Sequence, residues 1–304
     1  MTRTTLLVIL VTGCIACRPV STRDPLEGIP VYTAKDLTDS VFTAGIEGPA
    51  VDAGGLVYAV NYYAEGTIGF IQPDGQAGLF VQLPAGSTGN GIRFDQRGDM
   101  LVADYTGHNI LRVSLVSHMT ERWAHNDSLH QPNDLAIMDN GIVFLSDPDW
   151  AQERGSLWRV NKEKVFTCLE TNMGTTNGIE VSPDNRTLYV NESIQRNVWA
   201  YDLDEQGNIS QKRLLIRFED HGLDGMRCDT AGNLYITRWG KGTVAIVSPA
   251  GKLLHEVRLK GQKPSNIAFG GQDGRTCYVT LQDRGRIEAF KSETPGREFM
   301  MMTH

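Results

Sequence analysis

The sequence lacks the features that assign many functions directly. Its 304 residues include 36 acidic side chains against 29 lysines and arginines, for a net charge of −7. Nucleic-acid binding needs a basic surface, so this charge excludes nucleic acid as a partner. The motifs G-x-S-x-G, H-E-x-x-H and G-x-G-x-x-G are absent, and so is the P-loop. The chain therefore carries no signature of a serine esterase, a zinc peptidase or a common nucleotide-binding protein.

Cysteine is also scarce, with five residues in the chain. Cys14 and Cys17 fall in the N-terminal segment, whereas Cys168, Cys228 and Cys277 fall in strand-like segments. Three remaining cysteines cannot all pair with one another, which argues against a disulfide framework. We expect buried free thiols instead.

The longest apolar run is too short to cross a membrane. It lies in MTRTTLLVILVTGCIAC and covers roughly 12 residues, whereas a spanning helix needs about 20. A basic Arg3 followed by such a run is typical of an export signal, which we predict over 1–23. The residues VTGC end at Cys14 and resemble a lipobox, so Cys14 is the predicted lipidation site, with Cys17 or plain cleavage as alternatives. This predicts an exported protein of the periplasm or cell envelope that touches a bacterial membrane only through its lipid anchor.

The sequence does contain a long-period repeat. Each of six segments has a polar first residue, a short apolar strand, a turn rich in Asp, Asn or Gly, and a second apolar strand. These polar residues, called leaders below, are Glu47, Asn90, Asn133, Asn177, Asp224 and Asn266. Their spacings are 43, 43, 44, 47 and 42 residues. A period of about 40–50 residues with four strands per unit is the signature of a β-propeller.

We therefore predict an all-β fold, a six-bladed β-propeller with four antiparallel strands per blade, over residues 31–292. Residues 293–304 are expected to form a polar C-terminal tail, and no segment predicts an amphipathic helix. The segment SVFTA at 40–44 looks like an outer strand without a blade of its own. We predict that an N-terminal strand from residues 31–44 closes the last blade, which removes an exposed edge.

In a propeller the first strand of each blade lines the central channel, so the six leaders should point toward one axis. All six offer a side-chain oxygen, and two of them are carboxylates. Such a ring of oxygen atoms suits a divalent cation, above all Ca²⁺. The competing explanation is that each leader only stabilises an Asx turn. Two acids on one axis would repel each other without a cation or a proton between them, which favours the metal.

Other side chains should reach the same end of the channel from the loops between second and third strands. These loops combine aromatic and polar groups, which suits a small polar ligand. The loop residues are Tyr62, Tyr105, Asp147, Trp150, Glu192, Arg238 and Trp239. His221, three residues before Asp224, is either a further residue at the mouth of the site or a solvated loop histidine.

Four segments resemble the gluconolactonase and senescence-marker-protein (regucalcin) family, and more distantly diisopropyl fluorophosphatase. They are QPNDLAIMDNGIVFLSDP, TNGIEVSPDNRTLYV, LDGMRCDTAGNLYI and PSNIAFGGQDGRTCYVT, in the family's order. The resemblance implies a six-bladed propeller that holds one divalent cation through Glu47, Asn177 and Asp224. Asn133 would contact metal or substrate, and Asn90 and Asn266 would meet substrate or water. Gln131 stands where regucalcin has a substrate-contacting arginine, which indicates another subgroup.

The same resemblance implies lactone hydrolysis. A cation would polarise the carbonyl and activate water, with Asp224 as general base or, as in phosphofluoridate hydrolases, as nucleophile. The leading hypothesis is a metal-dependent lactonase acting on a gluconolactone-like sugar lactone, with Ca²⁺ as cation and Zn²⁺, Mn²⁺ or Mg²⁺ as alternatives. Asn133, Gln131, Asn90, Asn266, His221, Asp147, Arg238 and Trp239 are the candidate substrate contacts.

Two other functions remain open at this point. One is an organophosphate or ester hydrolase on the same site. The other is a non-enzymatic, envelope-tethered propeller that binds a ligand or Ca²⁺, since propellers often only bind. The oligomeric state is not predicted.

Overall fold

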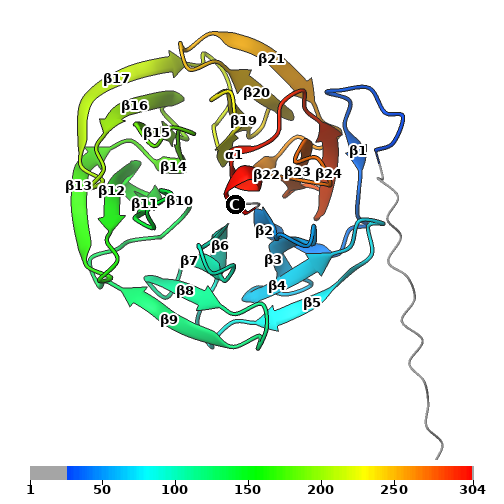
Figure 1. Cartoon of the computed structure of the whole chain (residues 1–304), viewed down its shortest axis with the longest axis horizontal. Coiled ribbons are helices and arrows are strands. Elements are labelled where there is room, and N and C mark those ends of the chain that lie inside the picture. The colour runs from blue at the N-terminus through cyan, green and yellow to red at the C-terminus, as the bar shows by residue number, and fades with distance from the viewer. Residues whose placement is uncertain (1–25, 303–304) are drawn as a thin grey trace, which may run out of the picture.

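Six antiparallel sheets of four strands each form a ring around a central channel (Figure 1). The computed structural model describes residues 26–302. This arrangement confirms the predicted six-bladed propeller. Each blade runs from an innermost strand at the channel to an outermost strand at the rim.

The first blade consists of β2 (Phe42–Val51), β3 (Val57–Tyr62), β4 (Thr67–Ile71) and β5 (Ala77–Gln82). The second consists of β6 (Gly89–Phe94), β7 (Met100–Asp104), β8 (Asn109–Val113) and β9 (Thr120–His125). The third consists of β10 (Leu135–Ile137), β11 (Val143–Asp149), β12 (Arg154–Val160) and β13 (Phe166–Met173). The next two are β14 (Thr176–Val181), β15 (Thr187–Glu192), β16 (Asn197–Leu203) and β17 (Ile209–Arg217); and β18 (Met226–Cys228), β19 (Leu234–Arg238), β20 (Thr243–Val247) and β21 (Leu253–Arg258). The last blade holds β22 (Pro264–Gly270), β23 (Thr276–Leu281), β24 (Arg286–Lys291) and β1 (Lys35–Asp36).

The hydrophobic core lies between neighbouring blades rather than within any one of them. Phe144 and Leu157 of the third blade, for example, pack against Val190 and Tyr201 of the fourth. Because each sheet is buried on both faces by its neighbours, the inner strands are buried along most of their length. The leaders, and other buried polar residues of these strands such as Arg93, Glu180 and Arg227, therefore each need a partner.

The N-terminal strand closes the ring, as predicted. Lys35 pairs with Ala289 and Asp36 with Glu288. A hydrogen bond from Arg284 lowers the pKa of Asp36 to about 2 and so keeps this strand ionically tied to β24.

The closing strand lies within the predicted range 31–44, but the SVFTA segment is not part of it. Residues 42–44 of the SVFTA segment belong to β2, the innermost strand of the first blade. The true closing strand is short and polar, so hydrophobic alternation could not reveal it.

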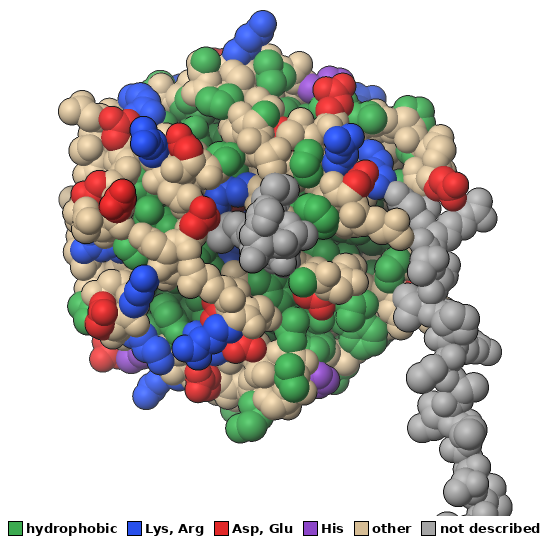
Figure 2. Space-filling view, in the orientation of Figure 1, with side chains coloured by type: hydrophobic (Ala, Val, Ile, Leu, Met, Phe, Trp, Pro, Cys, Tyr) green, Lys and Arg blue, Asp and Glu red, His purple; other side chains and the backbone are tan. Residues whose placement is uncertain are grey.

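The C-terminal segment also differs from the prediction. Instead of a plain polar tail, its residues include α1 (Arg297–Met302), which lies close to the channel axis (Figure 1). Just before α1, Gly296 forms an isolated β-bridge with Asp229. Acidic and basic side chains are interspersed around the rim of the face where α1 lies (Figure 2).

Three expectations concern cysteines and the membrane. Cys228 and Cys277 are buried free thiols as expected, but Cys168 is exposed, because it lies on the outermost strand β13. The predicted export signal and lipidated Cys14 lie outside the described residues. Within residues 26–302, no helix is sufficiently long and apolar to cross a membrane.

The closing strand predicts a measurable loss of stability. A variant that begins at Val41 lacks β1 and the apolar side chains packed beneath it, such as Leu26 and Leu37. We expect its melting temperature to fall by about 5 °C or more, since about 2–4 °C correspond to each kcal/mol in a chain of this size. A variant that begins at Leu26 is the control, and equal melting of both variants by differential scanning calorimetry would contradict the role of β1.

Candidate active site

The leaders lie where the innermost strand of each blade bulges or begins. The strand register shifts around Glu47, Asn90, Asn177 and Asn266. In the third and fifth blades, β10 and β18 begin just after Asn133 and Asp224. Bulges and strand starts interrupt the regular alternation of side chains and re-aim the residue at that point. This local geometry frees each leader from the apolar packing of its strand.

Glycine follows four of the leaders, and the structure shows why. These residues are Gly48, Gly91, Gly178 and Gly225. A Cβ on Gly178 would lie 2.5 Å from the main-chain oxygen of Asp224, and one on Gly225 would lie 2.0 Å from Cγ of Asn266. Neighbouring inner strands thus approach so closely that no side chain fits between them. The leader–glycine pairs bring each leader against the next blade.

Five of the six leaders line one pocket of about 620 Å³ at an end of the channel. They are Glu47, Asn90, Asn133, Asn177 and Asp224. The pocket wall also includes Tyr105, Trp150, Arg196, His221 and Trp239. Asn266 is not part of the wall. It lies buried behind Glu47, with its Nδ2 donating to Glu47 Oε2 at 3.0 Å.

The surroundings of two carboxyl groups in this pocket raise their pKa values. Burial raises the pKa of Glu47 to about 7, although the main-chain N–H of Gly48 donates to Oε2 at 2.6 Å. Burial, followed by the negative charge of Glu47, raises the pKa of Asp224 well above its usual value, and a hydrogen bond from Asn177 only partly offsets this. Within residues 26–302, neither carboxylate forms an ion pair with a lysine or arginine. Neither carboxylate therefore has a basic side chain at ion-pair distance in this range, although the more distant charge of Arg227 acts to lower the pKa of Glu47.

The donor set fits a divalent cation. Oδ1 of Asn177 is buried and has no hydrogen-bond partner among the described residues, so an oxygen acceptor beside the two acids is unused. Two carboxylates and an amide oxygen form a hard ligand set of the kind that Ca²⁺ and Mg²⁺ prefer. The described part of the chain holds no cluster of three or more His, Cys, Asp or Glu side chains able to bind a metal. Because only two of the leaders are acids, a cation here would also need amide oxygens as ligands.

Not every predicted substrate contact reaches the pocket. Asn90, Asn133, His221 and Trp239 line it, whereas Gln131, Asp147, Arg238 and Asn266 do not.

Asp147 is fully buried and accepts hydrogen bonds from the main-chain N–H groups of His130 and Gln131, so it shapes the loop that precedes Asn133. Gln131 supports a pocket residue instead, because its Oε1 accepts a hydrogen bond from the main-chain N–H of Trp150 at 3.4 Å.

Arg238 is likewise turned away from the pocket. It forms ion pairs with Asp220 at 2.7 Å and Glu256 at 3.2 Å, and its guanidinium lies 3.9 Å from the ring centre of Phe218. The pocket arginine is Arg196, in the loop between β15 and β16, which the sequence analysis missed. Its guanidinium has no ion pair or hydrogen bond among the described residues. In the sequence, only its position in a loop between a second and a third strand could have indicated that Arg196 lines the pocket.

The fold and the pocket define a six-bladed propeller with a pocket of buried carboxylates and amides at one end of its channel. Residues 45–283 match the family described as SMP-30/Gluconolactonase/LRE-like region, and the chain belongs to this family.

The individual relatives share moderate sequence identity with this chain. A gluconolactonase from Zymomonas mobilis is 28% identical over 240 residues, which cover 69% of this chain and 66% of that protein. A 6-deoxy-6-sulfogluconolactonase from Pseudomonas putida is 32% identical over 214 residues, 68% of this chain and 72% of that one. The first curated relatives are matched over 54–72% of their own lengths. The solved structure of a calcium-binding protein, regucalcin, from Agrobacterium tumefaciens has the same fold, with a TM-score of 0.76, 21% identity, and coverage of 87% of this chain and 95% of that one.

The two unpaired carboxylates predict an unusual response to mutation. In a chelator, Glu47→Gln should melt at a higher temperature than the parent, because it removes the repulsion between Glu47 and Asp224. The parent should be stabilised by Ca²⁺, by about 2.7 kcal/mol at 100 times Kd, and the variant should lose most of this gain. Differential scanning fluorimetry with and without Ca²⁺ measures both effects.

Glu65→Gln is the matched control, since Glu65 lines the same pocket but is exposed and hydrogen-bonded to Thr43. It should respond to Ca²⁺ like the parent. An unchanged response of Glu47→Gln to Ca²⁺ would contradict the assignment of Glu47.

Proposed function

We propose that this protein is a divalent-cation-dependent lactonase that opens a sugar-type lactone in the pocket lined by the leaders. The observation that carries the proposal is the buried pair Glu47 and Asp224, which has no basic partner and stands beside the unused Oδ1 of Asn177. Membership of the SMP-30/gluconolactonase family supports the reaction class. Gluconolactonase and sulfogluconolactonase relatives support a sugar lactone as substrate.

Glu47, Asn177 and Asp224 would hold the cation, with Asn133 beside it. When bound there, a divalent cation polarises a carbonyl oxygen and lowers the pKa of water. Ca²⁺ is the proposed ion, a choice supported by the oxygen-only ligand set.

The reaction requires water to add to the lactone carbonyl carbon and the ring C–O bond to break. Asp224 would accept the proton of the attacking water as general base. Burial and the charge of Glu47 raise its pKa well above the usual value, which makes the carboxylate a stronger base. The proton then passes to the departing ring oxygen, which leaves an aldonic acid. Asn177 donates a hydrogen bond that holds the Asp224 carboxylate in place.

The aromatic wall positions the sugar ring. Tyr105, Trp150 and Trp239 line the pocket, and flat aromatic faces suit the apolar C–H surface of a sugar ring. The indole N–H of Trp239 donates to Gln282 at 3.0 Å, which fixes the orientation of that ring. The loops can therefore orient the lactone over the leaders and limit the access of bulk water.

Replacement of the base should abolish turnover. Asp224→Asn is expected to lower kcat for glucono-δ-lactone by about 100-fold or more, the usual contribution of a general base together with its ligand role. A pH-indicator assay with Ca²⁺ or with chelator measures the rate. Asp220→Asn is the control, because Asp220 lies four residues earlier and pairs with Arg238 outside the pocket.

Undiminished turnover by Asp224→Asn would refute the proposed role of Asp224. If the parent binds Ca²⁺ but turns over no lactone, aryl ester or phosphotriester, the pocket belongs to a binding protein instead.

Arg196 predicts the charge of the preferred substrate. A pocket-lining guanidinium without a carboxylate partner suits an anionic substituent, such as a carboxylate, phosphate or sulfonate on the sugar. Arg196→Gln should lower kcat/KM about tenfold for a lactone with such a group and leave neutral glucono-δ-lactone almost unchanged. Equal effects on charged and neutral lactones would show that Arg196 does not read substrate charge.

A further inference from the structure

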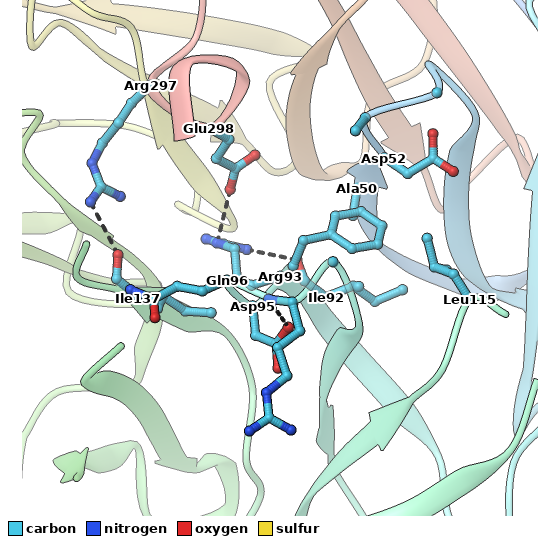
Figure 3. A pocket seen from close by; sticks show the side chains of 15 residues that line it. Ala50, Asp52, Ile92, Arg93, Asp95, Gln96, Leu115, Ile137, Arg297 and Glu298 are labelled. Carbon is cyan, nitrogen blue, oxygen red and sulfur yellow. Dashed lines mark hydrogen bonds and ion pairs between the residues drawn. The ribbon is translucent and has the colours of Figure 1, made fainter. Parts of the chain in front are cut away.

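A second group of charged side chains fills the channel between the pocket and the C-terminal helix. Oε1 of Glu298 on α1 lies 3.0 Å from Nε of Arg93 and 2.8 Å from Nε of Arg227. Figure 3 shows Glu298 reaching down from α1 toward Arg93. The arginine side chains are only 5% and 1% exposed. Their charges therefore act in a medium with little water, where each requires compensation.

The same two arginines converge on Asp134, the residue after the leader Asn133. Nη1 of Arg93 lies 2.9 Å from Asp134 Oδ1, and Nη1 of Arg227 lies 3.4 Å from Asp134 Oδ2. Asp134 is fully buried. It stands where four other blades have a glycine after the leader, so the third blade uses this position to hold the arginines.

Arg227 also connects this group to the pocket. Its Nη1 donates to Oδ1 of Asn266 at 3.2 Å, and Nδ2 of Asn266 donates to Oε2 of Glu47 at 3.0 Å. A continuous path thus runs from Glu298 through Arg227 and Asn266 to Glu47. Because Asn266 and Gly48 both bond Oε2, the other oxygen of Glu47 is left for a ligand in the pocket.

Each arginine of this group has acidic partners. Arg93 and Arg227 share Asp134 and Glu298, so two positive charges face two negative ones. Arg297 has its own partners, Glu180 at 3.5 Å and the exposed Asp139 at 2.9 Å. Glu298 is the member of the set that comes from the C-terminal helix and contacts both channel arginines.

We propose that Glu298 is a positioning residue for the cation site: it neutralises the arginine pair below the pocket, and so keeps Glu47 available to a divalent cation. The inference rests on the cation site proposed above. Without the negative charge of Glu298, Arg93 and Arg227 carry an excess positive charge. This excess attracts the Glu47 carboxylate through Asn266 and repels a cation in the pocket. The C-terminal helix thereby sets the affinity of the pocket for its metal.

Isothermal titration of the full chain with Ca²⁺ alone tests this inference. Glu298→Gln should weaken Ca²⁺ binding by about three- to tenfold, the size expected for one buried unit charge at an effective dielectric constant of about 20. Glu293→Gln is the matched control, because it makes the same change in the same segment at an exposed position. The control should keep the Kd of the parent.

A charge-balanced variant separates electrostatics from packing. Arg93→Gln alone should tighten Ca²⁺ binding, and Arg93→Gln/Glu298→Gln should return the Kd to within about twofold of the parent, because the positive and negative charges again balance. Loss of packing would instead weaken binding further in the double variant. Arg93→Gln also keeps the test decisive if Glu298→Gln fails to fold.

Three results would count against the inference, and they differ from a failure of the proposed function. A folded Glu298→Gln that binds Ca²⁺ as tightly as the parent overturns it. So does an Arg93→Gln that binds no more tightly than the parent, or a double variant that binds more weakly than Glu298→Gln. A parent that binds no Ca²⁺ overturns the proposed cation site itself, and the inference with it.

Discussion

The burial of Glu47 and Asp224 on one axis, without a basic partner, is the constraint on which the rest of the structure depends. Six blades bring their innermost strands together, and glycine after the leader allows the close approach. Burial then raises the pKa of both carboxyl groups, and the negative charge of Glu47 raises that of Asp224 further. A proton or a cation between the acids would relieve their repulsion, which is the basis for the cation site that we propose.

The two ends of the channel differ in their electrostatics. Toward α1, arginines and carboxylates balance one another and hold the inner strands together. At the pocket, neither Glu47 nor Asp224 forms an ion pair among residues 26–302, and Arg196 lines the wall without an ion pair in that range. Asn266 is the junction, because it touches both Arg227 and Glu47. An ion-paired lower layer and an acidic upper layer support the cation site proposed at one end of the propeller.

The repeat in the sequence was sufficient to predict the ring and the leaders, because a fixed period and a polar residue before an apolar strand both follow from the geometry of a blade. Side-chain direction was not predictable in the same way. Arg238 ends β19, just before a loop that corresponds to that of Arg196, yet its side chain pairs with Asp220 and Glu256 away from the pocket. The closing strand of Lys35 and Asp36 is held by charge and main-chain hydrogen bonds, so it has no hydrophobic pattern. Helix α1 is also short, with six residues, and its position depends on contacts with residues far away in sequence.

The central claim is that Glu47, Asn177 and Asp224 bind one divalent cation together. The most direct measurement is a crystal structure of the protein grown with Mn²⁺, with anomalous diffraction recorded on both sides of the manganese absorption edge. The account predicts one anomalous peak within coordination distance of side-chain oxygens from all three residues. A well-ordered pocket without a peak, or a peak bound by other residues, would contradict it.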